Sequence, residues 1–262
     1  MLPSNPWDRL TYRELGFPPF PVETIPTIRG ENMISYYPGM TVNPDWWYFI
    51  RYSMSEIRRF KAGGGRMDRC VVHFLSFDPG VIDPLWNSNA FRKRCELMLE
   101  AGVRYIVAPD FSAWADMPMA LQIHNMYRSA VVTHDLAKAG FAVIPHPVSA
   151  HPMISHIMTG HVPLNSPTVL IDGCHLNKNG SAISRKMFWD VSREILERKP
   201  QFVLIWANDQ KVGREFMYTF KTTAVQWVPA RNFAQRKFIE AIDKAKVAAG
   251  FVEPKKRRGA AK

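Results

Sequence analysis

The sequence predicts an α/β protein built on parallel strands. From residue 70 onward, six short apolar runs alternate with segments of helical periodicity, and most of the runs are apolar throughout instead of alternating with polar residues. Parallel strands are covered on both faces, so they read as continuous apolar runs. The chain has 262 residues, 47% of them hydrophobic, which is enough to bury a substantial core.

The predicted strands cover residues 71–77, 105–108, 141–144, 168–171, 202–206 and 224–228. Helices are predicted over residues 89–100, 116–139, 153–158, 181–199 and 234–249, from apolar positions three or four residues apart. Gly102, Gly140 and Gly250 follow the last turns of three of these helices, and Pro200 stops a fourth.

The first 45 residues are rich in proline and aromatic side chains and predict an extended arm that packs on the body. Residues 46–60 read as a helix, with Trp47, Ile50, Met54 and Ile57 on one face. The glycines at 63–65 precede a strand and are interpreted as a hinge. We therefore expect an arm and helix over residues 1–69, an α/β domain over 70–250 and a flexible basic tail over 251–262.

Two architectures fit this order of elements. A TIM-barrel-like fold, possibly incomplete, would form if residues 24–28 and 33–37 supply two more strands. Otherwise the sheet is open and doubly wound. We favour the barrel-like fold, and in either architecture ligands bind at the carboxyl ends of the strands.

Aspartates follow four of the predicted strands: Asp78, Asp110, Asp172 and Asp209. We expect these four to be the catalytic residues, gathered at one rim. Held apart, one carboxylate can act as nucleophile or base while another serves as acid. Held close together, they would need a bridging cation such as Mg²⁺. Each aspartate alone could instead cap the following helix.

Further polar residues near the same rim are candidates for substrate binding. Ser112, His146 and Asn208 follow strand ends, while Asn125 and Arg128 lie one turn apart on the next helix. That pair could face the rim or a bound phosphate, and an ion pair with a neighbouring acid is the alternative for Arg128.

The formal net charge of +11 comes from two segments. Residues 51–69 hold six basic and two acidic side chains, and residues 231–262 hold ten basic and three acidic side chains. Such patches neutralise phosphates, so we expect nucleic acid as the partner. A merely solubilising tail is the alternative. The expected phosphate contacts are Arg58, Arg59, Lys61, Arg66, Lys255, Lys256, Arg257 and Arg258.

Several other classes of protein are disfavoured. No apolar run is long enough to span a membrane, and the first residues lack a secretory pattern. Cys70, Cys95 and Cys174 form no Cys-x-x-Cys pair, so we expect a reducing, cytoplasmic location without a membrane partner. The histidines at 146, 151, 156 and 161 are poorly spaced for metal binding, so neither a metal site nor a cofactor is predicted, Mg²⁺ excepted if the protein is a nuclease.

Four strings of the sequence resemble an uncharacterised α/β family of phages and mobile elements. They are Val107-Ala-Pro-Asp-Phe-Ser112, Asp116-Met-Pro118, Gln122-Ile-His-Asn-Met-Tyr-Arg-Ser129 and Gly140-Phe-Ala-Val-Ile-Pro145. The resemblance covers about residues 70–210, and its Pro-Asp-Phe-Ser and Asn-x-Tyr-Arg-Ser motifs are the most specific parts. Here His146 stands where the family usually carries an aromatic residue shortly after Ile-Pro. The resemblance implies a phage origin and a task related to nucleic acid.

A more distant resemblance is to the barrels that exchange guanine for a deazaguanine in nucleic acid. It implies two strand-end aspartates, one of which attacks the sugar carbon. Asp78 or Asp110, with Asp172 or Asp209, would take these parts, although the cysteine-rich zinc site of the tRNA enzymes is not matched. We therefore expect a phage-type enzyme that exchanges or modifies bases in DNA, with a small-molecule base donor. RNA as the substrate, a Mg²⁺-dependent nuclease and a non-catalytic DNA-binding protein are the alternatives.

Overall fold

The computed structural model describes residues 11–28, 33–75, 79–111, 113, 117–147, 151–174, 182–208, 210–219 and 224–229. In these ranges the strands form two sheets in which all pairings are parallel. The first contains β1 (Met33–Ser35), β2 (Trp47–Arg51), β3 (Cys70–His73), β4 (Tyr105–Val107) and β5 (Ala142–Ile144), in that order. The second contains β6 (Val169–Asp172), β7 (Phe202–Ala207) and β8 (Ala224–Pro229).

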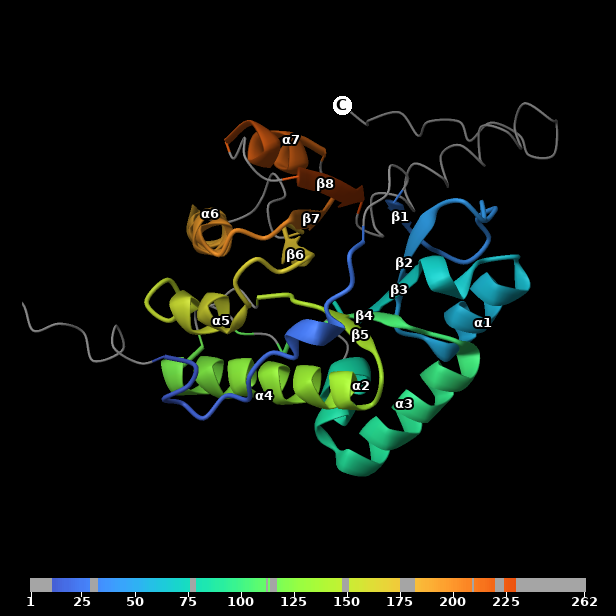
Figure 1. Ribbon diagram of the computed structural model, residues 1–262, viewed down its shortest axis with the longest axis horizontal. Helices are drawn as coiled ribbons and strands as arrows, with labels where there is room; N and C mark the ends of the chain where they lie inside the picture. Colours follow the sequence, from blue (N-terminus) through green and yellow to red (C-terminus); the bar gives the residue numbers. More distant parts are fainter. Residues whose placement is uncertain are drawn as a thin grey trace, which may run out of the picture.

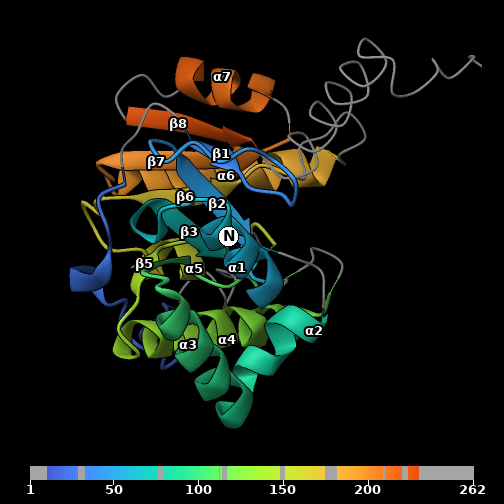
Figure 2. The same cartoon turned by 90° about the vertical axis from the view of Figure 1, so that its right-hand side faces the viewer.

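Helices lie outside the strands: α1 and α3 flank the first sheet, and α6 and α7 flank the second (Figures 1 and 2). The α-helices are α1 (Met54–Ala62), α2 (Pro79–Ile82), α3 (Ser88–Ala101), α4 (Met119–Lys138), α5 (Ser155–His161), α6 (Ala182–Glu197) and α7 (Gln210–Thr219). Single 3-10 turns occur at η2 (Val22–Thr24), η3 (Met67–Arg69) and η4 (Asp83–Trp86). No helix in the described part of the chain has the length and hydrophobicity needed to cross a membrane.

The six apolar runs are confirmed as strands, and helices lie between them where the periodicity predicts them. The run at 71–77 is shorter than expected, since β3 ends at His73. Gly102 closes α3 with a φ of 90°, a conformation that glycine adopts without strain. The helix expected at 234–249 lies outside the described residues, as do Asp116 and Ser181, the first residues of the helices predicted over 116–139 and 181–199.

The helix predicted over residues 46–60 is wrong in its first half, because Trp47–Arg51 is a strand. The apolar positions in this segment fit both a helical and a twofold period. Tyr48 and Ile50 pack in one core cluster while Phe49 packs in another, so the segment is buried on both faces. Only α1, which begins at Met54, keeps the expected helical conformation. Residues 1–69 thus contribute two strands to the first sheet.

The barrel expectation is met only in part. Residues 33–35 form a strand as expected, but residues 24–28 do not, since Thr24 ends a 3-10 turn and residues 25–28 have no regular secondary structure; the other additional strand is β2. Hydrogen-bonded ladders in the described residues define two sheets, and a closed barrel is not confirmed. One backbone hydrogen bond, from Leu170 N–H to the carbonyl of Pro145 at 2.9 Å, links β6 to the segment after β5. At the other side, β1 lies against β8.

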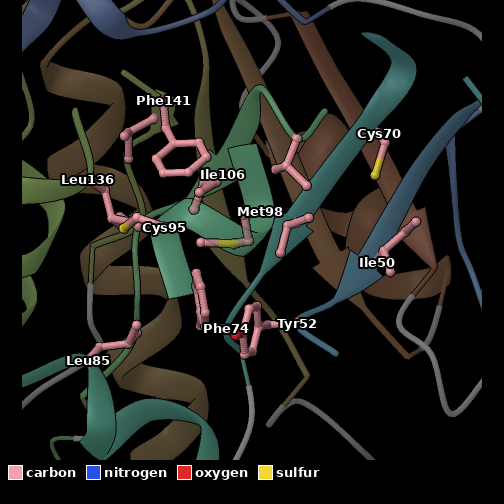
Figure 3. Packing of buried hydrophobic residues seen from close by; sticks show 14 of the residues in the cluster. Ile50, Tyr52, Cys70, Phe74, Leu85, Cys95, Met98, Ile106, Leu136 and Phe141 are labelled. Atoms are coloured by element: carbon pink, nitrogen blue, oxygen red, sulfur yellow. The ribbon is translucent and has the colours of Figure 1, made fainter. Parts of the chain in front are cut away.

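Two outer hydrophobic clusters fasten the helices to the sheets. In the first sheet, Ile50, Cys70 and Ile106 from neighbouring strands meet Met98 of α3 and Leu136 of α4 (Figure 3). Around the second sheet, α6 and α7 supply Phe188, Val191, Ile195, Val212 and Phe216. The cysteines Cys70, Cys95 and Cys174 are all free thiols.

A third cluster, the inner core, lies on the opposite face of both sheets. Its fully buried members come from strands and adjoining loops, without a helical residue among them. Every strand contributes at least one side chain: Met33, Phe49, Val71, Val107, Ile144, Leu170, Leu204 and Val228. The two sheets therefore enclose one common interior, and this interior determines where a ligand could bind.

Candidate functional site

The inner face changes from apolar to polar at the carboxyl ends of the strands. Side chains two residues apart on a strand point to the same face. Two positions beyond the inner-core residues Met33, Phe49, Val71, Ile144 and Leu170 come Ser35, Arg51, His73, His146 and Asp172. We call these five residues the polar layer. The edge of the interior that generally carries active sites in parallel α/β proteins is therefore the polar one here.

Trp206 lies at the centre of several contacts of the polar layer. Its indole Nε1–H donates a hydrogen bond to the hydroxyl of Ser35 at 3.3 Å, across from β7 to β1. Its ring lies 5.0 Å from the imidazole ring of His73, measured between centroids. In the sheet, Trp206 is the register partner of Asp172, and His73 that of Arg51. The strands thus bring residues from both sheets together around one indole.

The carboxylate of Asp172 is held by the turn that follows β6. Its Oδ1 accepts a hydrogen bond from the backbone N–H of Cys174 at 2.7 Å. Burial, the charge of Asp172 and a hydrogen bond to that carboxylate all raise the pKa of the Cys174 thiol, so the thiol stays protonated at neutral pH. The turn therefore fixes the orientation of the carboxylate, and the Cys174 N–H occupies its Oδ1 atom.

Asn208 reaches the same turn from the end of β7. Its Nδ2 donates to the carbonyl of Cys174 at 3.4 Å, while its buried Oδ1 has no hydrogen-bond partner in the described part of the protein. Of the predicted site residues, Asp172 and Asn208 are thus brought together through Cys174.

His146 is a second buried histidine at this edge, with 4% of its surface exposed. Among the described groups, its Nδ1 has no hydrogen-bond partner. Burial of an unpaired polar atom costs free energy unless water or a ligand satisfies it. His146 thus lies in the polar layer with an unpaired ring nitrogen, and its role in substrate binding stays a prediction. Asp110 is half-buried in the segment between β4 and α4.

Asn125 and Arg128 lie on α4, outside the sheets, and contact each other, while their role in substrate binding stays a prediction. Arg128 donates to Asn125 Oδ1 at 3.4 Å and forms an ion pair with Asp83 at 3.1 Å, the alternative that the sequence left open. Its guanidinium stacks 4.1 Å from the centroid of the Phe111 ring. The Phe111 N–H donates to the Ser129 hydroxyl at 3.1 Å. The Pro-Asp-Phe-Ser and Asn-x-Tyr-Arg-Ser motifs therefore contact each other directly.

The basic residues of the 51–69 segment lie away from the polar layer, with the exception of Arg51. Arg58 and Arg59 are exposed on α1. Lys61 donates to the carbonyl of Ala101, and Arg66 forms an ion pair with Asp68 at 2.5 Å. Because α1 leads back to the amino end of β3, Lys61 and Arg66 lie toward the edge opposite the polar layer.

Some predicted site residues lie outside the described residues, and the structure does not place them. These are Asp78, Ser112, Asp209, Lys255, Lys256, Arg257 and Arg258. In the described ranges, no three His, Cys, Asp or Glu side chains gather as potential metal ligands.

Sequence reasoning missed Ser35, Arg51, His73 and Trp206. His73 was read as part of a buried apolar strand, and it is indeed buried, with 1% of its surface exposed. Its position in the strand could have indicated it. His73 lies two residues after the inner-core residue Val71, so the two side chains point to the same face, and His73 is at the carboxyl end of the strand.

Together, these features define a parallel α/β protein with a polar layer at the carboxyl ends of its strands, in which Ser35, His73 and His146 are buried and Arg51 and Asp172 are half-buried. The chain belongs to the family described as "Domain of unknown function (DUF4417)", whose model matches residues 50–223. The match includes both sequence motifs and most of the polar layer.

The chain is similar to the "Gene 1 protein" of Mycobacterium phage L5. The two are 32% identical over 162 residues, which cover 62% of this chain and 66% of the phage protein, just under two thirds of its length. No solved structure matches the chain significantly. The expected membership of an uncharacterised phage family is therefore confirmed, whereas the distant relation to the base-exchanging barrels stays a prediction.

Proposed function

We propose that this protein is a phage-type enzyme that modifies nucleic acid, with its chemistry in the polar layer. The observation that carries the proposal is the change of the inner face from apolar to polar at the carboxyl ends of the strands. His73 and His146 are almost completely buried there, beside Arg51 and Asp172. Buried polar and ionisable groups are costly for folding, and they concentrate at functional sites.

The proposal includes a barrel-like arrangement of the two sheets. The common inner core, the hydrogen bond between Leu170 and Pro145 and the contact between β1 and β8 support a ring in the order β1 to β8. In such a ring the polar layer would form the floor of a site surrounded by the loops that follow the strands.

The most concrete reaction that fits these groups is exchange of a nucleobase. The carboxylate of Asp172 would attack C1′ of the target nucleoside, and the bond from C1′ to the base nitrogen would break. The leaving base takes a proton from the imidazolium of His146. An incoming base then attacks C1′, returns its N–H proton to His146 and releases the carboxylate. The target base has to leave the stack to be reached.

Mass spectrometry of nucleosides tests the proposal. DNA and RNA from cells that produce the wild-type protein should contain a modified nucleoside that is absent from cells producing Asp172→Asn. The conservative change keeps an acceptor for the Cys174 N–H, so the variant should remain folded. Identical nucleoside profiles from wild type and variant, with the phage's other genes supplied, would overturn the assignment.

A further inference from the structure

An exposed tryptophan, Trp86, lies outside the polar layer and is surrounded by aromatic rings. The proposed chemistry gives no role to this arrangement. Trp86 ends η4 and leaves 42% of its surface exposed. The rings of Phe111, His124 and Tyr127 surround it at centroid distances of 6.5, 6.3 and 6.4 Å, each inclined by more than 70°. These contacts hold the indole in one orientation although much of it faces solvent.

Arg128 supports the indole from within the protein. The guanidinium carbon lies 5.6 Å from the Trp86 ring centroid and 4.1 Å from that of Phe111, and the ion pair with Asp83 holds the guanidinium in place. A cation over an aromatic face is stabilising in its own right. Trp86 and Arg128 therefore form a pre-organised plane with a positive charge behind it, which we call the Trp86 platform.

The platform lies toward the same edge of the sheets as the polar layer. Trp86 directly precedes the cap of α3, in the connection that leaves the carboxyl end of β3. Phe111 lies in the connection that leaves the carboxyl end of β4. In parallel βα units these connections line the edge where substrates enter.

The basic side chains at the start of α3, the helix that follows Trp86 and contacts η4, favour an anionic partner. Arg92 and Lys93 are exposed on the first turns of α3. Asp83, three residues before Trp86 in the sequence, is ion-paired with Arg128. Aromatic planes flanked by basic side chains are the usual means of binding unpaired nucleic acid, because every base can stack and every phosphate is negative.

We propose that the Trp86 platform stacks an unpaired base of single-stranded nucleic acid. The inference deepens the proposed function, on which it rests for the nature of the polymer, by naming an unpaired strand as the form of substrate. Arg92 and Lys93 contact the phosphates on either side. A strand held in this way presents a neighbouring nucleotide to the polar layer.

Fluorescence anisotropy with the full-length protein tests the inference. The probes are a fluorescein-labelled 20-nucleotide oligothymidylate and a labelled 20-base-pair duplex. The single strand should bind wild type more tightly than the duplex does. Trp86→Ala should weaken single-strand binding about 5- to 100-fold, as expected for the loss of one stacked base. Trp86→Phe, which keeps an aromatic plane, should retain most of the affinity.

Two controls make the result decisive. Tyr218→Ala removes another exposed aromatic residue, on α7, and should leave binding unchanged. Trp86→Leu keeps apolar volume without an extended plane and should lose affinity as Trp86→Ala does, which covers the case that the alanine variant misfolds. If folded Trp86→Leu binds the single strand with wild-type affinity, the platform proposal is overturned. The same holds if the Trp86 substitutions weaken binding of the single strand and of the duplex equally. Normal single-strand binding by the wild-type protein, together with a nucleoside profile that is the same for wild type and Asp172→Asn, would overturn the proposed chemistry alone.

Discussion

The backbone N–H of Phe111 donates a hydrogen bond to the side-chain hydroxyl of Ser129 at 3.1 Å. This contact joins the segment after β4 to the middle of α4, 18 residues further along the chain. Both residues are almost fully buried, and Arg128 stacks on the Phe111 ring beside the bond. The two motifs that first suggested a family thus act as one structural lock, which fixes the position of the Asp110 segment relative to α4.

Replacing Ser129 with alanine should destabilise the fold. The Phe111 N–H would remain buried without its acceptor, which typically costs about 1–3 kcal/mol. Urea unfolding followed by circular dichroism measures the change in the free energy of unfolding. Thr219→Ala, at the exposed end of α7, is the control and should change stability by less than about 0.5 kcal/mol. A Ser129→Ala variant as stable as the control would contradict the lock.

Asp172→Asn should abolish nucleoside modification while the protein stays folded. Loss of a catalytic carboxylate typically lowers a rate by ~10²–10⁴-fold. Since the asparagine oxygen can still accept from the Cys174 N–H, the thermal midpoint should shift by no more than a few degrees. Product is quantified by mass spectrometry over time. If activity persists at the wild-type rate, the carboxylate serves only to shape the turn.

Gly65→Ala should be destabilising for steric reasons. A Cβ at this position would lie 2.4–2.5 Å from carbon atoms of the Phe60 ring, which is completely buried. Overpacking of this kind costs about 1–3 kcal/mol. At the neighbouring Gly63 the nearest atom would be 3.3 Å away, so Gly63→Ala should cost clearly less. Equal stabilities of the two variants in urea would show that the segment moves freely, as the predicted hinge would.

Acid should weaken the attachment of the N-terminal segment through His161. Burial lowers the pKa of this imidazole below its ordinary value of 6.5, although its hydrogen bond to the Pro18 carbonyl raises it and His134 lowers it further. Below about pH 6.5 the unfolded chain therefore binds a proton more readily than the folded one. The free energy of unfolding should fall as the pH drops from 6.5 toward the folded-state pKa, and His161 should have no such effect above pH 6.5.

Comparing His161→Gln with wild type isolates this contribution. The difference in unfolding free energy between pH 7.5 and pH 5 should be smaller in the variant, because glutamine does not titrate. Urea melts at both pH values give the two differences. An unchanged pH dependence would mean that other groups account for the acid sensitivity.

The fold was largely predictable because the strands are buried on both faces. Val71, Val143 and Val203 all lie in runs whose side chains reach a core on either side, and such runs stand out from the sequence. The helix prediction for residues 46–60 was wrong in its first half because Trp47, Ile50 and Ile57 have a helical spacing, whereas the segment forms β2, which is buried on both faces. Local periodicity could not decide between helix and strand for this segment, since the strand conformation depends on pairing with β1 and β3.

The candidate site was less predictable than the fold. Counting aspartates after predicted strands pointed to Asp172. Which side chains face the interior, however, depends on whether they lie an even number of residues from an inner-core residue on the same strand. His73 shares the parity of Val71, and Arg51 that of Phe49, a relation that becomes visible only once both sheets are assembled. Arg128, a candidate phosphate ligand by residue type, lies beside the rings of both Phe111 and Trp86, contacts that residue type alone does not predict.

The proximity of β1 to β8, and of β6 to the segment after β5, has a consequence for behaviour at high concentration. The outermost strands of a sheet usually offer unpaired amide and carbonyl groups, on which a strand of another molecule can assemble. Here each terminal strand of one sheet has a neighbour from the other sheet, which obstructs such assembly. In its described part, the molecule is thereby protected against strand-by-strand aggregation by its own topology, without needing charged gatekeepers along those margins.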